Sequence, residues 1–149
     1  MSTLVTVTES VFVRCTPEVL WDYTQDFARR REWDASVREV HVLATQPVPR
    51  VRVHSAGGVR AVFQYKQFER PVRTSLALED VESVWIEGGG GSWSYERHAD
   101  GTLWTQTNSL RIRAGFWRAL FVPWIRGQLR TSTRKAMLRA KQHVEARGG

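Results

Sequence analysis

The sequence predicts an α+β protein in which a curved antiparallel sheet of about seven strands packs against one long C-terminal helix. Two patterns support this prediction. Residues 3–13 and most of residues 37–113 alternate apolar with polar side chains and are rich in β-branched types, which is typical of half-buried strands. Residues 115–147 space their apolar side chains by three and four positions, which is typical of an amphipathic helix. Such a helix needs a large apolar partner surface, so helix and sheet are expected to form two layers.

Length and composition indicate one globular domain, residues 1–149, with a hydrophobic share of 42%. Cys15 is the single cysteine, so no intramolecular disulfide can form, and we expect a small buried side chain there. No apolar run approaches the roughly 20 residues that cross a bilayer, and the N-terminus lacks the core of a signal peptide. We therefore expect a cytoplasmic protein.

Two short helices are expected after the first strand. Thr16 can cap a helix, Pro17 suits its first position, and Glu18 favours the positive end of its dipole. This helix is predicted to run to about Phe27. A second helix is predicted over residues 29–33, with all three arginines of residues 29–31 facing solvent.

The middle of the chain is expected to form a meander of strands at residues 37–43, 50–54, 60–69, 73–80, 84–98 and 102–113. The run Gly88–Gly91 inside the fifth of these predicts a bulge, a sharp bend or a turn. Asp100 and Gly101 favour a tight turn before the last strand. Pro123 predicts that the C-terminal helix kinks or restarts near Val122, because proline lacks a backbone donor.

Positive charge is concentrated in the C-terminal helix. The segment from Gly115 onward holds eight basic residues and a single acid, Glu145, which accounts for the whole net charge of +7. Arg126, Arg130 and Arg134 fall on one stripe with Lys141. This stripe is either a solvated outer face or a contact surface for an anionic membrane or an acidic protein. Nucleic acid is disfavoured as a partner, because it would need base-stacking aromatic side chains beside the stripe, and the nearby Trp117 and Trp124 are expected to pack inward.

Four segments resemble the helix-grip superfamily called START-like or SRPBCC. Residues 16–23 (Thr-Pro-Glu-Val-Leu-Trp-Asp-Tyr) are similar to the start of its first helix, and residues 27–34 to its second helix with a following tryptophan. Asp100-Gly101-Thr102 matches the turn before its last strand, and residues 136–145 match the end of its long helix. The resemblance covers essentially the whole chain. It implies a sheet that grips the C-terminal helix, as in the birch pollen allergen and the polyketide cyclase/dehydrase and lipid-transport families.

The resemblance also implies a ligand cavity between the sheet and the long helix, and strand parity indicates which side chains would line it. An aromatic wall with two amides and two phenols would suit a lipid, polyketide or aromatic ligand that bears a carbonyl or hydroxyl group. The alternative is an ordinary filled core whose amides point to solvent. The expected lining residues are Phe63, Tyr65, Trp93, Tyr95, Trp104, Gln106 and Asn108 on strands, and Phe121, Ile125, Leu129, Thr133 and Ala136 on the helix.

Three functional hypotheses follow for this chain. The leading one is a binder of a small hydrophobic molecule. The second is an enzyme of the polyketide cyclase/dehydratase type, with Tyr65, Tyr95 or His41 moving protons. The third is a non-catalytic module that uses the basic helix face.

Other chemistry is disfavoured by the residue pattern. The four histidines are far apart in the sequence and show no metal-site spacing, so no zinc site is expected. The glycine run lacks a following Lys-Ser/Thr, so it does not predict a phosphate loop. Asp34 is expected to shape a turn. No metal or cofactor is therefore expected, and the pattern makes no prediction of the oligomeric state.

Overall fold

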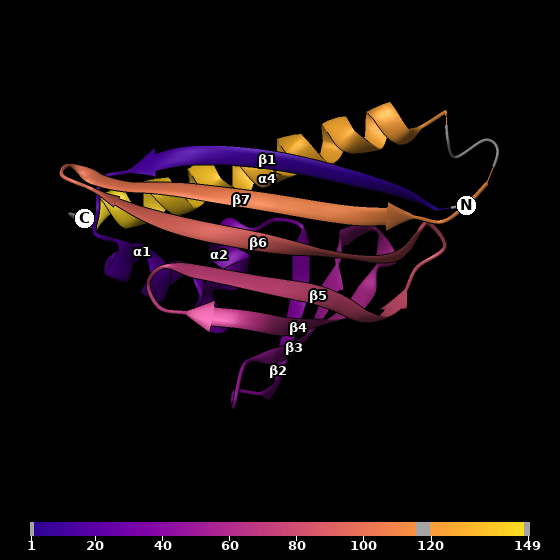
Figure 1. Cartoon of the computed structure of the whole chain (residues 1–149), viewed down its shortest axis with the longest axis horizontal. Helices are drawn as coiled ribbons and strands as arrows, with labels where there is room; N and C mark the ends of the chain where they lie inside the picture. Colours follow the sequence, from indigo (N-terminus) through magenta and orange to yellow (C-terminus); the bar gives the residue numbers. More distant parts are fainter. Residues whose placement is uncertain (1, 116–119, 148–149) are drawn as a thin grey trace.

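The computed structural model describes residues 2–115 and 120–147. A seven-stranded antiparallel sheet forms one layer, and the helices lie on one side of it (Figure 1). The order along the chain is β1 (Thr3–Val13), α1 (Pro17–Thr24), a 3₁₀ turn (Phe27–Arg29), α2 (Arg30–Trp33), β2 (Val37–Ala44), β3 (Arg50–Ser55), a second 3₁₀ turn (Ala56–Gly58), β4 (Arg60–Glu69), β5 (Arg73–Glu82), β6 (Ile86–His98), β7 (Gly101–Ile112) and α4 (Val122–Ala146).

The first and last strands are neighbours in the sheet, because β1 pairs along its whole length with β7. The strand order is β1-β7-β6-β5-β4-β3-β2, so all the remaining neighbours in the sheet are strands that follow one another in the sequence. On the outer face of β1 and β7, hydroxyl side chains pair across the strands at 2.8–3.1 Å: Thr6 with Ser109, Thr8 with Thr107, and Ser10 with Thr105. The predicted α+β helix-grip architecture is confirmed, with strand bounds shifted by only one or two residues.

Helix α1 begins as predicted but ends earlier. The Oγ1 atom of Thr16 accepts a hydrogen bond from the Val19 amide at 3.3 Å, and Pro17 occupies the first turn. The helix stops at Thr24 rather than near Phe27, because Asp26 caps the following 3₁₀ turn by accepting from the Ala28 amide at 3.0 Å. The prediction of an unbroken helix to Phe27 was therefore wrong.

Helix α4 begins at Val122, so the predicted start at Gly115 was wrong; Gly115 is not helical, and residues 116–119 lie outside the described part of the chain. Pro123 lies in the first turn, where amides have no partner within the helix, so it starts the helix rather than kinking it. The 25 residues of α4 extend about 38 Å at the usual rise per residue. None of the described helices is long and apolar enough to cross a membrane.

The buried side of α4 belongs to its C-terminal half. Thr133, Ala136, Met137, Ala140 and Val144 are buried, chiefly against β1, α1 and α2. These residues share a core with side chains of β1, β6, β7 and both short helices. A second apolar cluster lies beneath β2, β3 and β4, and Phe68 packs against both clusters. The sheet therefore presents one continuous inner face to the helices.

Candidate functional site

Side chains from β6 and β7 form the centre of the inner face. Tyr95 pairs across the strands with Trp104, and Trp93 pairs with Gln106, so these four side chains lie on the same side of the sheet. All four are at most 8% exposed. Strand parity correctly predicted that they share this face with Asn108.

The inner face is filled by aromatic rings where α2 covers it. Trp33 of α2 packs against both Trp93 and Trp104, and the three rings meet edge to face with centroids 5.7–5.9 Å apart. Tyr95 stacks on Trp104 at 6.0 Å. The predicted lining residues in this half therefore pack mainly against one another, as in the filled-core alternative.

Arg30 was expected to face solvent, and that prediction was wrong. Its side chain is only 11% exposed and lies over the rings of Trp33 and Trp93, with the guanidinium carbon 4.7 and 5.0 Å from the two centroids. Its Nε donates to Asp34 at 2.9 Å. The sequence spacing could have predicted these contacts. Residues three and four apart on a helix are neighbours, and Trp33 and Asp34 lie three and four positions after Arg30.

Asp34 also shapes the turn after α2, as the sequence predicted. Its Oδ1 accepts from both the amide and the hydroxyl of Ser36 at 3.1 and 2.6 Å. The carboxylate thus holds Arg30 from one oxygen and the turn from the other. This leaves Arg30 as a fixed positive charge beside the aromatic cluster.

The two predicted amides point inward and connect the sheet to α4. Asn108 Nδ2 donates to Gln106 Oε1 at 3.0 Å and to Thr133 Oγ1 at 3.2 Å, and its Oδ1 accepts from Trp93 Nε1 at 3.3 Å. Glu9 of β1 lies opposite Gln106, and its carboxylate is 3.6 Å from Arg134. The side-chain amides of Gln106 and Asn108 therefore face the interior, and the alternative in which they point to solvent is wrong.

Three buried N–H donors near the aromatic cluster have no protein acceptor among the described residues: Trp33 Nε1, Trp104 Nε1 and Gln106 Nε2. Leaving such a donor unpaired costs about 1–3 kcal/mol, so each strongly favours an oxygen acceptor. Trp33 lies on α2, and Trp104 and Gln106 lie on β7, so the three unpaired N–H donors lie at the inner face of the sheet. A ligand oxygen or a water molecule would satisfy it.

The other half of the inner face is apolar and only half-buried. Asn108, Gly91, Leu76 and Tyr65 form one row across the sheet, and Leu110 and Gly89 begin the next. The side chains of Leu76 and Leu110 are only half-buried, as are those of Leu78 and Phe63, which pair with each other. The predicted helix residues Ile125 and Leu129 are half-buried as well, whereas Phe121 is 46% exposed.

Glycines deepen this half of the face. β6 continues through Gly88–Gly91 with a bulge after Ile86, which confirms the predicted irregularity. A side chain at Gly89, whose φ is +154°, would clash with the Ser109 backbone oxygen, and one at Gly91 would meet Asn108 Oδ1 at 2.8 Å. Glycine is therefore required at Gly89, and the two glycines leave the inner face without a side chain between Leu76, Leu78 and Leu110.

The family model for polyketide cyclase/dehydrase and lipid transport matches residues 5–145. The chain belongs to this family. No curated protein matches the sequence closely. The START-like resemblance seen in the sequence is thus confirmed by the match of nearly the whole chain.

Solved structures agree with the family assignment. The protein TTHA0849 from Thermus thermophilus has 15% identity and a TM-score of 0.83, and the match covers 97% of this chain and 99% of the other. A START superfamily protein from Mycobacterium smegmatis has 15% identity and a TM-score of 0.74, with 95% and 98% covered. The Zhui aromatase/cyclase from Streptomyces sp. R1128 has 15% identity and a TM-score of 0.72, with 99% and 97% covered. At such identities the likeness establishes the fold alone.

The buried hydroxyl of Tyr95 makes two hydrogen bonds within the protein, one to Thr24 and one to Gln25. Thr24 Oγ1 gives its only proton to the Leu20 carbonyl at 2.8 Å, so in the 2.8 Å contact between Thr24 and Tyr95 the tyrosine must donate. Tyr95 also accepts from Gln25 Nε2 at 2.8 Å. Burial raises the pKa of Tyr95, so its hydroxyl stays protonated and holds α1 to the sheet.

Tyr65 and His41 have contrasting environments. Tyr65 is 2% exposed, burial raises its pKa while the Arg30 charge opposes the rise, and no hydrogen bond from the described residues reaches its hydroxyl. His41 lies on edge strand β2 with a 62% exposed side chain, 3.4 Å from Glu39. The structure therefore brings Tyr65 to the inner face and leaves His41 outside it.

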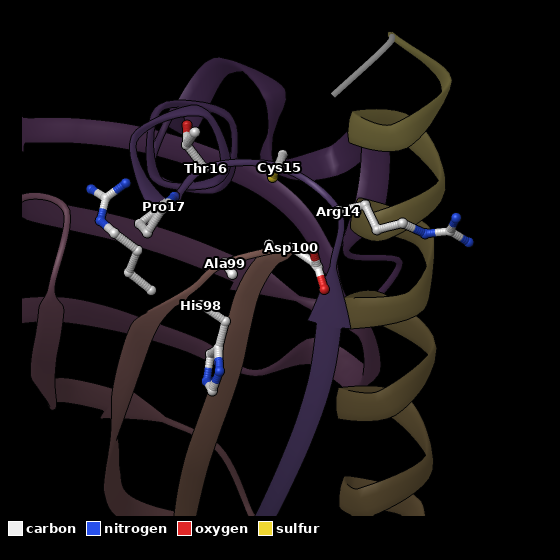
Figure 2. Close-up of a pocket in the computed structure, with 9 residues that line it drawn as sticks. Arg14, Cys15, Thr16, Pro17, His98, Ala99 and Asp100 are labelled. Carbon is white, nitrogen blue, oxygen red and sulfur yellow. The ribbon is translucent and has the colours of Figure 1, made fainter.

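Two hollows on the described surface lie outside the sheet–helix interior. One, of about 490 Å³, lies between the loop after β1 and the β6–β7 turn, lined by residues 14–17 and 97–101. Figure 2 shows His98 and Asp100 at this hollow, with the Arg14 side chain directed toward α4. The second, of about 400 Å³, borders Tyr23 and Arg147. Burial raises the pKa of Cys15, at the first hollow, to about 11, so its thiol is protonated at neutral pH, in keeping with its buried position.

Proposed function

We propose that this family member binds a small hydrophobic molecule bearing an oxygen acceptor, between the sheet and the N-terminal half of α4. One observation carries the proposal: half-buried apolar side chains adjoin a cluster with buried, unpaired N–H donors. Leu76, Leu78 and Leu110 would contact the apolar body. Gln106 Nε2 and Tyr65 would donate to the oxygen.

Arg30 supports the same orientation for the ligand. Its guanidinium is fixed by Asp34 and by the rings of Trp33 and Trp93. A positive charge held beside the inner face attracts the negative end of a carbonyl or hydroxyl dipole, and in a partly desolvated site this attraction is stronger than in water. The acceptor end of the ligand is therefore directed toward α2 and its apolar end toward Leu78 and Leu110.

The experiment is native mass spectrometry of protein purified from cells, followed by thermal-shift titration with matched probes. 2-Naphthol and naphthalene share an apolar body, but only the first carries an oxygen. Stabilisation that grows with concentration is expected for both and should be larger for 2-naphthol. Equal shifts would refute the role of the donors, and no shift with either probe would refute binding of compact aromatic ligands at this site.

A pair of variants on one strand tests the location. Leu76→Trp places a large ring on the open half of the inner face and should abolish the thermal shift. Ala77→Trp adds the same ring to the neighbouring position, which faces the other side of the sheet, and should leave the shift unchanged. Loss of binding in both variants, or in neither, would contradict this location.

Catalysis of the cyclase/dehydratase type is the second candidate because of Tyr65. Among the three tyrosine and histidine candidates it alone combines burial on the inner face with a hydroxyl that no described residue engages. A phenol with a raised pKa is a hydrogen-bond donor rather than a base at neutral pH, so it would polarise a ligand carbonyl. Turnover of an aromatic polyketide that disappears in Tyr65→Phe, while binding persists, would support an enzyme. Binding without turnover in the wild type would support a passive carrier.

A further inference from the structure

The first turns of α4 expose large apolar side chains. No residue from Val122 to Ser132 is buried, and the first buried position of the helix is Thr133. Trp124 is 64% exposed, and Leu120 and Phe121, just before the helix, are 73% and 46% exposed. A contiguous group of exposed large apolar residues marks a surface that contacts another molecule.

The turn between β5 and β6 exposes a second apolar group at the same end. Val84 and Trp85 are 72% and 39% exposed, and the Arg113 amide at the end of β7 donates to the Trp85 carbonyl at 2.7 Å. Figure 1 places this turn, the start of β1 and the start of α4 at one end of the molecule. We call the exposed side chains there the apolar end: Leu4, Val84, Trp85, Leu120, Phe121 and Trp124.

Positive charge adjoins the apolar end. The sequence contains no Asp or Glu from Gly101 to Val144. Arg111 and Arg113 are exposed at the end of β7, and Arg126 and Arg130 are exposed on α4. Within residues 2–115 and 120–147, no carboxylate pairs with Arg126 or Arg130, so both charges remain available to an anion.

Acidic side chains near the apolar end lie on the sheet side. Glu82 and Glu87 are exposed on either side of Trp85, and Glu9 lies 3.6 Å from Arg134, further along α4. The β5–β6 turn therefore contributes apolar contact, and the helix contributes the positive charge. Arg126 and Arg130 thus follow Phe121 and Trp124 within the first turns of α4, with no acid between them in the sequence.

We propose that the apolar end docks on an anionic lipid surface. Tryptophan is enriched at the headgroup level of bilayers, where its ring is apolar and its N–H stays hydrated, which suits the exposed Trp124. Arginine binds phosphate through two parallel hydrogen bonds, which suits Arg126 and Arg130. A second copy of the chain fits less well, because self-association would bring two such positive surfaces together. The docking does not depend on a ligand in the interior.

Co-sedimentation with vesicles of phosphatidylcholine, alone or mixed with phosphatidylglycerol, tests the proposal. The protein should bind the mixed vesicles, bind phosphatidylcholine weakly, and be released by sodium chloride. Arg126→Gln with Arg130→Gln should lower partitioning about 25-fold, since each basic residue near an anionic surface contributes about fivefold. Trp85→Ala with Trp124→Ala should lower it about tenfold or more, through lost apolar contact.

A matched control separates the local surface from the overall charge. Arg38→Gln with Arg52→Gln removes the same charge from exposed positions of β2 and β3 and should change partitioning by less than about twofold. Thermal unfolding of every variant confirms that it is folded. No binding to the mixed vesicles, or an equal loss in the control, would overturn the proposal. So would dimers in solution that Trp124→Ala converts to monomers, since the second copy would then be the occupant.

Discussion

The two halves of α4 use the same helix in different ways. The C-terminal half presents Met137 and Ala140, each with 0% exposure, to β1 and the short helices. From Val122 to Ser132 no residue of the N-terminal half is buried, although Val122, Ile125 and Leu129 lie at helical spacing. One half therefore stabilises the fold, and the other leaves apolar surface available.

The sheet under α4 shows the same division. Toward α2, the inner face is filled by Trp33, Trp93 and Trp104. Toward the β5–β6 turn, Gly89 and Gly91 lower the face, and Leu76 stays half-buried. Stability and binding capacity are thus separated along one axis of the molecule, so changes in each half should have different consequences.

The largest difference is expected between Met137→Ala and Trp124→Ala. Truncating Met137 removes a fully buried side chain and should lower the free energy of unfolding by about 2–5 kcal/mol. Trp124→Ala removes a larger side chain that is 64% exposed and should change it by less than about 0.5 kcal/mol. Urea unfolding measures both. Similar losses would mean that the first turns of α4 also stabilise the fold.

A smaller difference is expected between two tyrosines of the inner face. Tyr95→Phe leaves Thr24 and Gln25 without their buried partner and should cost about 1–2 kcal/mol of unfolding free energy. Tyr65→Phe removes a hydroxyl that no described residue engages and should cost less than about 0.5 kcal/mol. The same two proteins, titrated with 2-naphthol, should show weaker binding only for Tyr65→Phe. The reverse pattern would make Tyr95 the ligand contact.

The smallest effect concerns Glu145, which joins the C-terminal half of α4 to β1. Burial raises the pKa of this carboxyl, but hydrogen bonds from Lys141 and the Arg14 amide outweigh burial and lower it below its ordinary 4.5. Because the folded pKa is lowered, the charge stabilises the fold above pH 4.5, and this contribution is lost as the pH falls through the folded pKa.

Glu145→Gln should therefore destabilise the protein at pH 7 by less than about 1 kcal/mol. The difference from the wild type should shrink as the pH is lowered below 4.5, the ordinary pKa of the carboxyl. Urea unfolding at a series of pH values measures it. A difference that is constant with pH would show that the amide disturbs packing rather than removing a charge effect.

Much of the sheet could be predicted because strand parity is a local property. Trp93, Tyr95, Trp104, Gln106 and Asn108 face the same side, as their alternation predicted. Arg30 was missed because a run of three arginines suggests solvent, whereas the turn of α2 places this one over Trp33. His41 could not be assigned from its strand, because alternation fixes a face only once the register and the covering elements are known.

The amino-acid sequence alone was enough to predict the α+β class, the order of the elements and which strand residues share a face. These depend on periodicity, capping residues and turns, which act over a few residues. That one half of the inner face is filled and the other half-exposed became visible only in the folded chain. This outcome depends on Trp33, some 60 residues before Trp93, and on where α4 leaves the sheet. Contacts between residues so distant in sequence arise from packing, which local pattern does not encode.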